Sequence, residues 1–237
     1  MSRSLAASVT HPHVYVRTLG LFHVQIQFMA TTWYGGGLGA RQLQSGAMYL
    51  FARPDTWVAL RELIPSRAAA RPNYVVTGVA QLFTRWGLKD AIERDDERLM
   101  LRKHPLWQSD TLELEAALQH VRRVPTLADR LAILEPAVAL CQGAFMHAFD
   151  ANPLFSLSDQ QVQWDITQCL LINDFCRACL ATADVYRYRQ ALFYAQHAMQ
   201  LELEDKETYL LAAAAAKRLR MAQTAVWYTQ RAAAFDD

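Results

Sequence analysis

The first strand-like pattern lies near the start of the chain, where apolar and polar residues nearly alternate. Residues 14–29 read VYVRTLGLFHVQIQFM and are rich in β-branched and aromatic side chains, with an interruption at Gly20. This pattern predicts strands. A glycine-rich stretch at 35–39 lacks the Gly-Lys-Ser/Thr ending of a phosphate-binding loop. We therefore interpret it as a flexible turn that leads into a helix.

Apolar residues then recur at helical spacing in three successive segments. The first helix is expected over 41–51, the second begins near Pro54 and ends at Pro65, and the third opens at Pro72 and ends at Gly87. Proline near a helix start and glycine at its end are typical boundary signals. The apolar faces are, in order, Leu43, Ala47, Leu50 and Phe51; Trp57, Leu60 and Ile64; and Val75, Val79, Leu82, Phe83 and Trp86.

A β-hairpin is predicted after the third helix. Ile92 and the pair Leu99 and Leu101 flank a polar tip at 95–97, which is the pattern of two short strands joined by a turn. The order strands, three helices, hairpin is that of a winged helix-turn-helix domain preceded by a small sheet. Such a domain places its third helix in a DNA major groove, and its hairpin, the wing, reaches the neighbouring backbone.

From Leu112 onward the whole chain has a helical pattern. Its apolar faces are Leu114, Leu118 and Val121; Leu127, Leu131, Leu134 and Val138; and Val162, Ile166 and Leu170.

An internal repeat is the strongest signal in this half of the chain. Residues 191–198 resemble residues 225–232 at an offset of 34, which is the period of tetratricopeptide (TPR) repeats. Small residues match at Ala191 and Ala198, and again at Cys179 and Ala213, as close helix crossing requires. Leu203 stands where the repeat usually has proline. Residues 112–150 predict an earlier, more divergent helix pair, so that about three stacked pairs bury their apolar faces together.

These patterns predict a mostly α fold in two domains. Residues 1–111 are expected to form a winged helix-turn-helix with a small β-sheet and a wing hairpin. Residues 112–237 are expected to form an all-α, TPR-like helical repeat domain. The segment 104–110 is expected to be a short linker, in which Pro105 and Trp107 favour docking of the domains over free swinging.

Composition narrows the class of protein. Of 237 residues, 52% are hydrophobic and 20% are charged, which excludes a disordered tail. No apolar run reaches the roughly 18 residues of a membrane span, and the N-terminus has no long apolar core of a secretory signal. We expect a cytoplasmic protein without membrane contact.

The net charge of +1 hides an asymmetry. Residues 1–111 hold 13 basic and 8 acidic residues, a balance of +5, whereas residues 112–237 hold 11 basic and 15 acidic residues, a balance of −4. Over residues 1–89 the balance is +7. The first third is therefore a candidate polyanion-binding surface, although small basic domains are also common without that role. Its basic residues include Arg41, Arg53, Arg61, Arg67 and Arg71.

Candidate chemistry is sparse. The cysteines Cys141, Cys169, Cys176 and Cys179 all lie in apolar, helix-patterned sequence. We favour core positions over a zinc site, which would need a fourth ligand. No serine-hydrolase, zinc-protease or Walker motif is present. We expect no enzyme activity, no metal and no cofactor.

Several short motifs, in order and spacing, resemble one family. Residues 16–24 (VRTLGLFHV) resemble its opening strand, and residues 79–87 (VAQLFTRWG) resemble the end of its recognition helix. Leu99-Met100-Leu101 with Ser109-Asp110 resembles the wing and the entry to a second domain, and residues 140–145 (LCQGAF) resemble a conserved turn. The family is the SARP-like class of bacterial transcriptional activators, in which an OmpR-like winged helix precedes a TPR-type bacterial transcriptional activator domain. The resemblance covers nearly the whole chain.

This resemblance implies a DNA-binding activator. The winged helix would bind a repeated promoter element as one of two or more copies, a homo-oligomer on double-stranded DNA. The repeats would contact RNA polymerase or another protein. Family members often extend into a nucleotide-hydrolysing domain, and since this chain ends after the repeats, we expect no ATPase. The candidate DNA-binding residues on the helix and the wing are Arg71, Asn73, Tyr74, Thr77, Gln81, Arg85, Arg98, Arg102 and Lys103.

One departure from the family leaves a second function open. Recognition helices of the family carry several basic residues on the face that enters the DNA groove. Here the non-basic residues Ala80, Gln81, Phe83 and Thr84 occupy such positions, and Arg85 alone is basic. The alternative is a protein-interaction adaptor or complex subunit that has lost DNA binding and contacts its partner through an exposed Phe83. The aromatic residues Trp33, Phe51, Trp57 and Trp86 fit base stacking or, better, a core.

The repeats carry their own candidate contacts. Tyr186, Tyr188 and Tyr194 fit either a peptide-binding groove or helix packing. Arg218 and Arg220 lie near a turn between helices, where they fit either an acidic partner or ordinary solvation.

Overall fold

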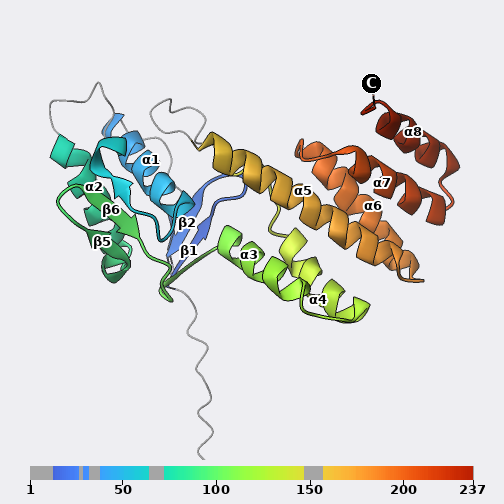
Figure 1. Cartoon of the computed structure of the whole chain (residues 1–237), viewed down its shortest axis with the longest axis horizontal. Helices are drawn as coiled ribbons and strands as arrows, with labels where there is room; N and C mark the ends of the chain where they lie inside the picture. Colours follow the sequence, from blue (N-terminus) through green and yellow to red (C-terminus); the bar gives the residue numbers. More distant parts are fainter. Residues whose placement is uncertain (1–12, 27–28, 32–37, 64–71, 147–156, 237) are drawn as a thin grey trace, which may run out of the picture. The chain divides into compact units, whose positions relative to one another are not determined.

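The computed structural model describes residues 13–26, 29–31, 38–63, 72–146 and 157–236. These residues divide into two compact units (Figure 1). The first is built mainly from Phe22–Ser109, and the second mainly from Asp110–Ala148 and Ser158–Asp237. The predicted fold class is confirmed, because the chain is mostly α, with a winged helix and small sheets first and helical repeats after it.

The first sheet of the winged-helix unit has the strand order β3-β2-β1-β7. The alternating pattern around Gly20 forms β1 (Val14–Arg17), β2 (His23–Ile26) and β3 (Met29–Thr31), each antiparallel to the next. β7 (Trp107–Ser109) pairs in parallel with β1. The expected short linker over 104–110 thus contains a strand that was not predicted, in which Trp107 and Ser109 are buried and which completes the sheet.

The second sheet has the order β4-β6-β5 and contains the wing. β5 (Ile92–Arg94) and β6 (Arg98–Leu101) form the predicted hairpin, and β4 (Val58–Ala59) pairs with the other edge of β6. The helix predicted after Pro54 is wrong, since between Pro54 and Leu63, where the structure describes the chain, only the short 3-10 turn η1 (Leu60–Glu62) is helical. Asp55 has a φ of 60°, which a right-handed helix does not allow.

Two helices pack on these sheets, and aromatic rings fill the space between them. α1 (Leu38–Ala52) contributes Phe51, and α2 (Pro72–Arg85) contributes Phe83 and is followed by the buried Trp86. The Phe51 ring lies 5.1 Å from that of Phe83 and 5.2 Å from that of Trp107. The predicted core role is confirmed for Phe51 and Trp86. Trp57 is 38% exposed instead, and Trp33 lies outside the described residues.

The second unit is a run of helices that pack one on the next (Figure 1). Their boundaries are α3 (Asp110–Val121), α4 (Leu127–Val138), α5 (Ser158–Leu180), α6 (Val185–Gln200), α7 (Lys206–Arg218) and α8 (Ala222–Ala233). The 34-residue offset relates α8 to α6. Four of the matched small residues, Cys179, Ala191, Ala198 and Ala213, are buried, which permits the close crossing that the repeat pattern requires.

The apolar face predicted on α5 is exposed to solvent instead of buried in the core. Val162, Ile166 and Leu170 on α5 are 59%, 50% and 52% exposed, whereas the neighbouring residues Leu171 and Phe175 are fully buried. α5 carries two apolar stripes at helical spacing, and α4, α6 and α7 cover only one of them. The first stripe is therefore an exposed surface rather than core.

The second unit also takes in the short segment Leu19–Leu21. Leu19 bridges Phe145, and its N–H donates to the buried Asp110 Oδ2 at 2.8 Å. Gly143 approaches so closely that a Cβ there would lie 3.2 Å from the Gly20 Cα. Two of the motifs that carry the family resemblance, at 16–24 and 140–145, thus meet in one place.

Candidate nucleic-acid interface

Helix α2 presents two different faces. Val76, Val79 and Phe83 are buried, whereas Thr77, Gln81 and Arg85 are exposed and lie one helical turn apart in succession. The exposed face therefore carries a hydroxyl, an amide and a guanidinium, the groups that proteins use to contact base edges and phosphates. Three further predicted residues are not described: Arg71 lies outside the described residues, as do the side chains of Asn73 and Tyr74.

Close packing on α1 fixes the orientation of α2. A Cβ added to Gly78 would lie 2.5 Å from the Leu43 side chain, and one added to Gly46 would lie 2.9 Å from Val79. The two helices thus cross where each has a glycine. α2 ends as predicted at Gly87, whose φ of 75° favours glycine. This packing turns Thr77, Gln81 and Arg85 outward.

The structure contradicts the expectation that Phe83 is an exposed contact. Its side chain is fully buried and lies between the rings of Phe51 and Trp86, with centroids 5.1 and 5.3 Å away. The reason is helical register, because Phe83 lies one turn beyond the buried Val79 and faces the same core. Thr84, the next residue, is exposed, and its hydroxyl donates to the Ala80 carbonyl oxygen at 2.9 Å.

Hydrogen bonds around Asp95 order the turn of the wing. Its Oδ1 accepts from the backbone N–H groups of Glu97 and Arg98 at 2.9 and 2.6 Å. These backbone bonds, the one from Glu97 most strongly, and the nearby Arg98 guanidinium hold the pKa of Asp95 below its ordinary value. The wing therefore carries a fixed negative charge at its turn.

Two of the predicted wing cations are already paired with carboxylates. Arg98 Nη2 lies 2.7 Å from Asp95 Oδ2, and the same guanidinium stacks over the Trp57 ring at 4.9 Å. Arg102 Nε lies 2.7 Å from Glu93 Oε1. The two arginine side chains are about half exposed and their carboxylate partners partly exposed, so the pairs are weak and open to exchange. The partly exposed Trp57 is thus a platform for Arg98.

The three cations from the end of α2 to the end of β5 are unpaired among the described residues. Within the part of the chain that the structure describes, the side chains of Arg85, Lys89 and Arg94 are exposed and form no ion pair or hydrogen bond. Lys89 begins η2 (Lys89–Ala91), which joins α2 to the wing, and Arg94 ends β5. Sequence reasoning left Lys89 and Arg94 out of the candidate site. The hairpin register could have indicated that Arg94 is unpaired, because the residue opposite it, Leu99, has no carboxylate.

Lys103 lies just after β6 and is exposed. Its backbone N–H donates to Asp55 Oδ1 at 2.9 Å, and the Asp55 N–H donates to the Leu101 carbonyl oxygen at 2.8 Å. The turn at Asp55 therefore holds the C-terminal arm of the wing in place, so Lys103 has a defined position at its base.

The predicted protein-contact residues of the repeats divide into exposed and buried. Tyr186 is 61% exposed, and Arg218 and Arg220 are exposed as well. Tyr194 is half-buried, with its ring 5.2 Å from that of Phe175. The interpretation of Tyr188 as a groove residue is wrong, because it is buried and its hydroxyl donates to the Thr182 carbonyl oxygen at 2.8 Å.

The cysteines lie in the core, as predicted. All four are buried, and burial raises the pKa of Cys141 and Cys179 to about 12, that of Cys169 to about 11, and that of Cys176 further still. Such thiols are poor nucleophiles and poor metal ligands. Over the described ranges, no cluster of three His, Cys, Asp or Glu residues is placed to hold a metal ion.

Membrane insertion finds no support among the described helices. None is both long and apolar enough to cross a bilayer.

Comparison with known proteins supports the fold. No protein-family model and no curated protein sequence matches the chain. Among solved structures, the chain is similar to Mycobacterium tuberculosis EmbR in complex with a low affinity phosphopeptide, with a TM-score of 0.69 and 14% sequence identity. The similarity covers 93% of this chain but 59% of the EmbR chain, so this chain spans less than two thirds of that protein's length. At this identity the likeness establishes the fold, a winged helix followed by helical repeats.

Proposed function

We propose that the chain is a DNA-binding transcriptional regulator of the SARP-like kind, acting as an activator. The observation that carries this proposal is the outward face of α2, where Thr77, Gln81 and Arg85 stand exposed beside the unpaired cations Lys89 and Arg94. The fold likeness to EmbR and the motif resemblance support it. So does the charge of +5 over residues 1–111, which attracts polyanions to this part of the chain.

Each exposed residue has a role in this proposal. Gln81 and Thr77 contact base edges in the major groove, and Arg85 contacts a guanine edge or an adjacent phosphate. Lys89 and Arg94 bind phosphates directly, because neither side chain must first break an ion pair with a carboxylate. Arg98, Arg102 and Lys103 add phosphate contacts, for which Arg98 and Arg102 exchange their ion pairs with Asp95 and Glu93.

The helical repeats supply the protein contact of the regulator. RNA polymerase is the partner expected of an activator, and Tyr186, Arg218 and Arg220 are exposed for it. Two or more copies of the chain bind side by side where the promoter element is repeated. The phosphopeptide in the EmbR complex supports peptide recognition in proteins of this fold; it does not identify a ligand of this chain.

The adaptor alternative loses the observation on which it depended. It required an exposed Phe83 on the third helix of the domain, but that side chain is fully buried. The remaining outward face of α2 is polar and basic, which suits DNA better than an apolar protein surface.

The test is a fluorescence-anisotropy titration of the full chain against promoter and random duplexes at two salt concentrations. We expect tight, salt-steep binding with a promoter preference. Arg85→Ala should weaken promoter binding by about 1–3 kcal/mol. Arg123→Ala is the matched control, since Arg123 is an exposed arginine of the second unit. No binding at low salt would refute the function, and an Arg85→Ala/Lys103→Ala variant as tight as wild type would refute the placement.

A further inference from the structure

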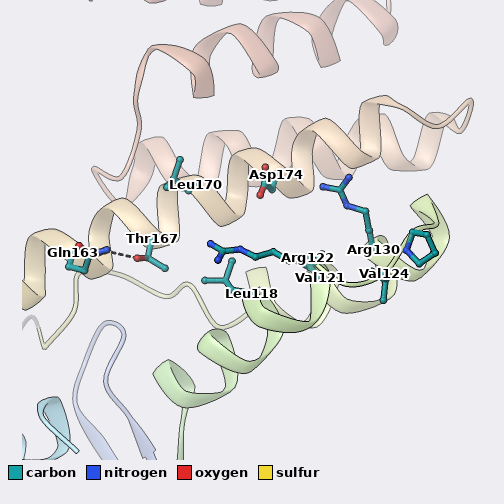
Figure 2. Close-up of a pocket in the computed structure, with 10 residues that line it drawn as sticks. Leu118, Val121, Arg122, Val124, Arg130, Gln163, Thr167, Leu170 and Asp174 are labelled. Carbon is teal, nitrogen blue, oxygen red and sulfur yellow. Dashed lines mark hydrogen bonds between the residues drawn. The ribbon is translucent and has the colours of Figure 1, made fainter. Parts of the chain in front are cut away.

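A groove in the second unit has no role in the proposed DNA contact. It lies between α3 and α4 on one side and α5 on the other, and encloses about 520 Å³ (Figure 2). Leu118 and Val121 of α3 and Leu170 of α5 provide apolar lining. The groove continues onto an exposed apolar surface, because Ile166 and Val162 lie one and two turns before Leu170 on the same face of α5.

Two arginines give this groove a positive charge. Arg122 follows α3, Arg130 lies in the first turns of α4, and Figure 2 shows both guanidinium groups reaching toward α5. Both are exposed and, judged over the described residues, neither side chain forms an ion pair or a hydrogen bond. Asp174 is the acidic residue of the lining, and its carboxylate is already paired with Arg177.

The combination of charge and apolar surface selects the chemistry of the occupant. A small anion would use the two guanidinium groups and leave the stripe of Val162, Ile166 and Leu170 exposed to water. A nucleic acid backbone would pair its phosphates with the two arginines but would offer no apolar side chains to cover that stripe. A peptide helix with carboxylates beside apolar side chains satisfies both features, since exposed apolar stripes on a helix are typical of partner sites.

We propose that this groove binds an acidic amphipathic segment of a partner protein. Carboxylates of the segment pair with Arg122 and Arg130, and its apolar side chains pack on Leu118, Leu170 and Ile166. Arginine suits the pairing because its planar group binds a carboxylate through two hydrogen bonds. The inference deepens the protein-contact part of the proposed function but does not depend on DNA binding, so the two fail in separate experiments.

The experiment is a peptide selection on the intact chain followed by affinity measurements. A displayed library of random peptides of about 16 residues, roughly four helical turns, is enriched on immobilised protein. The enriched peptides are then titrated by fluorescence anisotropy against wild type and three sets of variants. The double variant Arg122→Glu/Arg130→Glu tests the role of the two cations. Leu170→Ser tests the role of the apolar lining. The matched controls are Arg123→Glu, which lies beside the groove lining, and Val226→Ser, an exposed apolar residue on α8.

We expect the enriched peptides to be rich in Asp, Glu and Leu. Their binding should weaken at least about tenfold in the double charge reversal and in Leu170→Ser, and change less than about twofold in the controls. Far-UV circular dichroism must show that all variants are folded. The proposal is overturned if no peptide is enriched, if enriched peptides lack acidic residues, or if Arg123→Glu weakens binding as much as the double reversal does.

Discussion

The Phe83 side chain links the sequence of α2 to the stability of the winged-helix unit. It lies among the rings of Phe51 and Trp86 and has no exposed surface. Aromatic clusters of this kind combine a large buried area with favourable ring geometry. The same burial leaves Thr77, Gln81 and Arg85 facing outward, so a packing residue decides which residues are free to bind DNA.

Phe83→Ala is therefore expected to destabilise the domain rather than to remove a contact. The lost burial and the cavity left behind should lower the free energy of unfolding by about 3–5 kcal/mol. Denaturant unfolding followed by circular dichroism measures the change. Gln81→Ala on the exposed face of the same helix is the control and should stay within about 0.5 kcal/mol of wild type. Equal stability of Phe83→Ala and wild type would contradict the packing described here.

At the scale of the element, the wing is a hairpin whose cations are partly neutralised by its own acids. Asp95 orders the turn through two backbone N–H groups and also pairs with Arg98. Asp96 stands beside it at the same tip without a described partner. The two aspartates thus carry the same charge, but only Asp95 is paired with an arginine.

Asp95→Asn should strengthen DNA binding if the wing contacts phosphate. The amide oxygen can still accept from the turn, so the hairpin is kept, while the Arg98 guanidinium is released and one repulsive charge is removed. Asp96→Asn removes the same charge without releasing a cation. We expect Asp95→Asn to steepen the salt dependence of log Kd by about one counterion relative to Asp96→Asn. Anisotropy titrations across a salt series measure both slopes, and equal slopes would mean that Arg98 does not reach DNA.

Elements with a single apolar face could be predicted from the sequence. Segments whose spacing fits either a helix or a strand could not. α1, α2 and the β5–β6 hairpin follow directly from spacing, and Gly87 marks the end of the helix before it. The segment after Pro54 has helical spacing at Trp57 and Leu60, but pairing with β6 and the φ of Asp55 override it. These are tertiary effects that local spacing does not record.

The candidate sites show the same limit. The outward positions of Thr77, Gln81 and Arg85 could be predicted from helical period, because they recur every four residues on a face other than the buried one. The pairing of Arg98 and Arg102 could not, since it depends on hairpin register and rotamers. On α5, periodicity finds two apolar stripes and cannot tell which one is covered, so the exposed stripe at Leu170 became visible only in three dimensions.

At the scale of the whole molecule, charge and thiols are divided unequally along the chain. The basic excess lies in residues 1–111, and the cysteines all lie in the second unit, on α5 or in the turn after α4. DNA binding is therefore a property expected of the first unit. Thiol chemistry in turn reports on the second unit alone, which gives a separate measurement for each half of the protein.

The thiols should make the stability of the helical unit depend on alkaline pH. Burial raises the pKa of Cys141, Cys169 and Cys179 to between about 11 and about 12, whereas the ordinary thiol value is 9.0. Unfolded thiols therefore ionise first as pH rises, so the stabilisation is fully present below pH 9 and is lost progressively between about 9 and 12. Replacing Cys141 with Ala should reduce this loss of stability at alkaline pH, as measured by thermal unfolding.

The buried thiols should also be slow to react. In native buffer a thiol reagent should find no rapidly reacting cysteine, and in denaturant all four should react as the helical signal is lost. A rapid stoichiometric reaction of any cysteine in the native protein would contradict the buried placement.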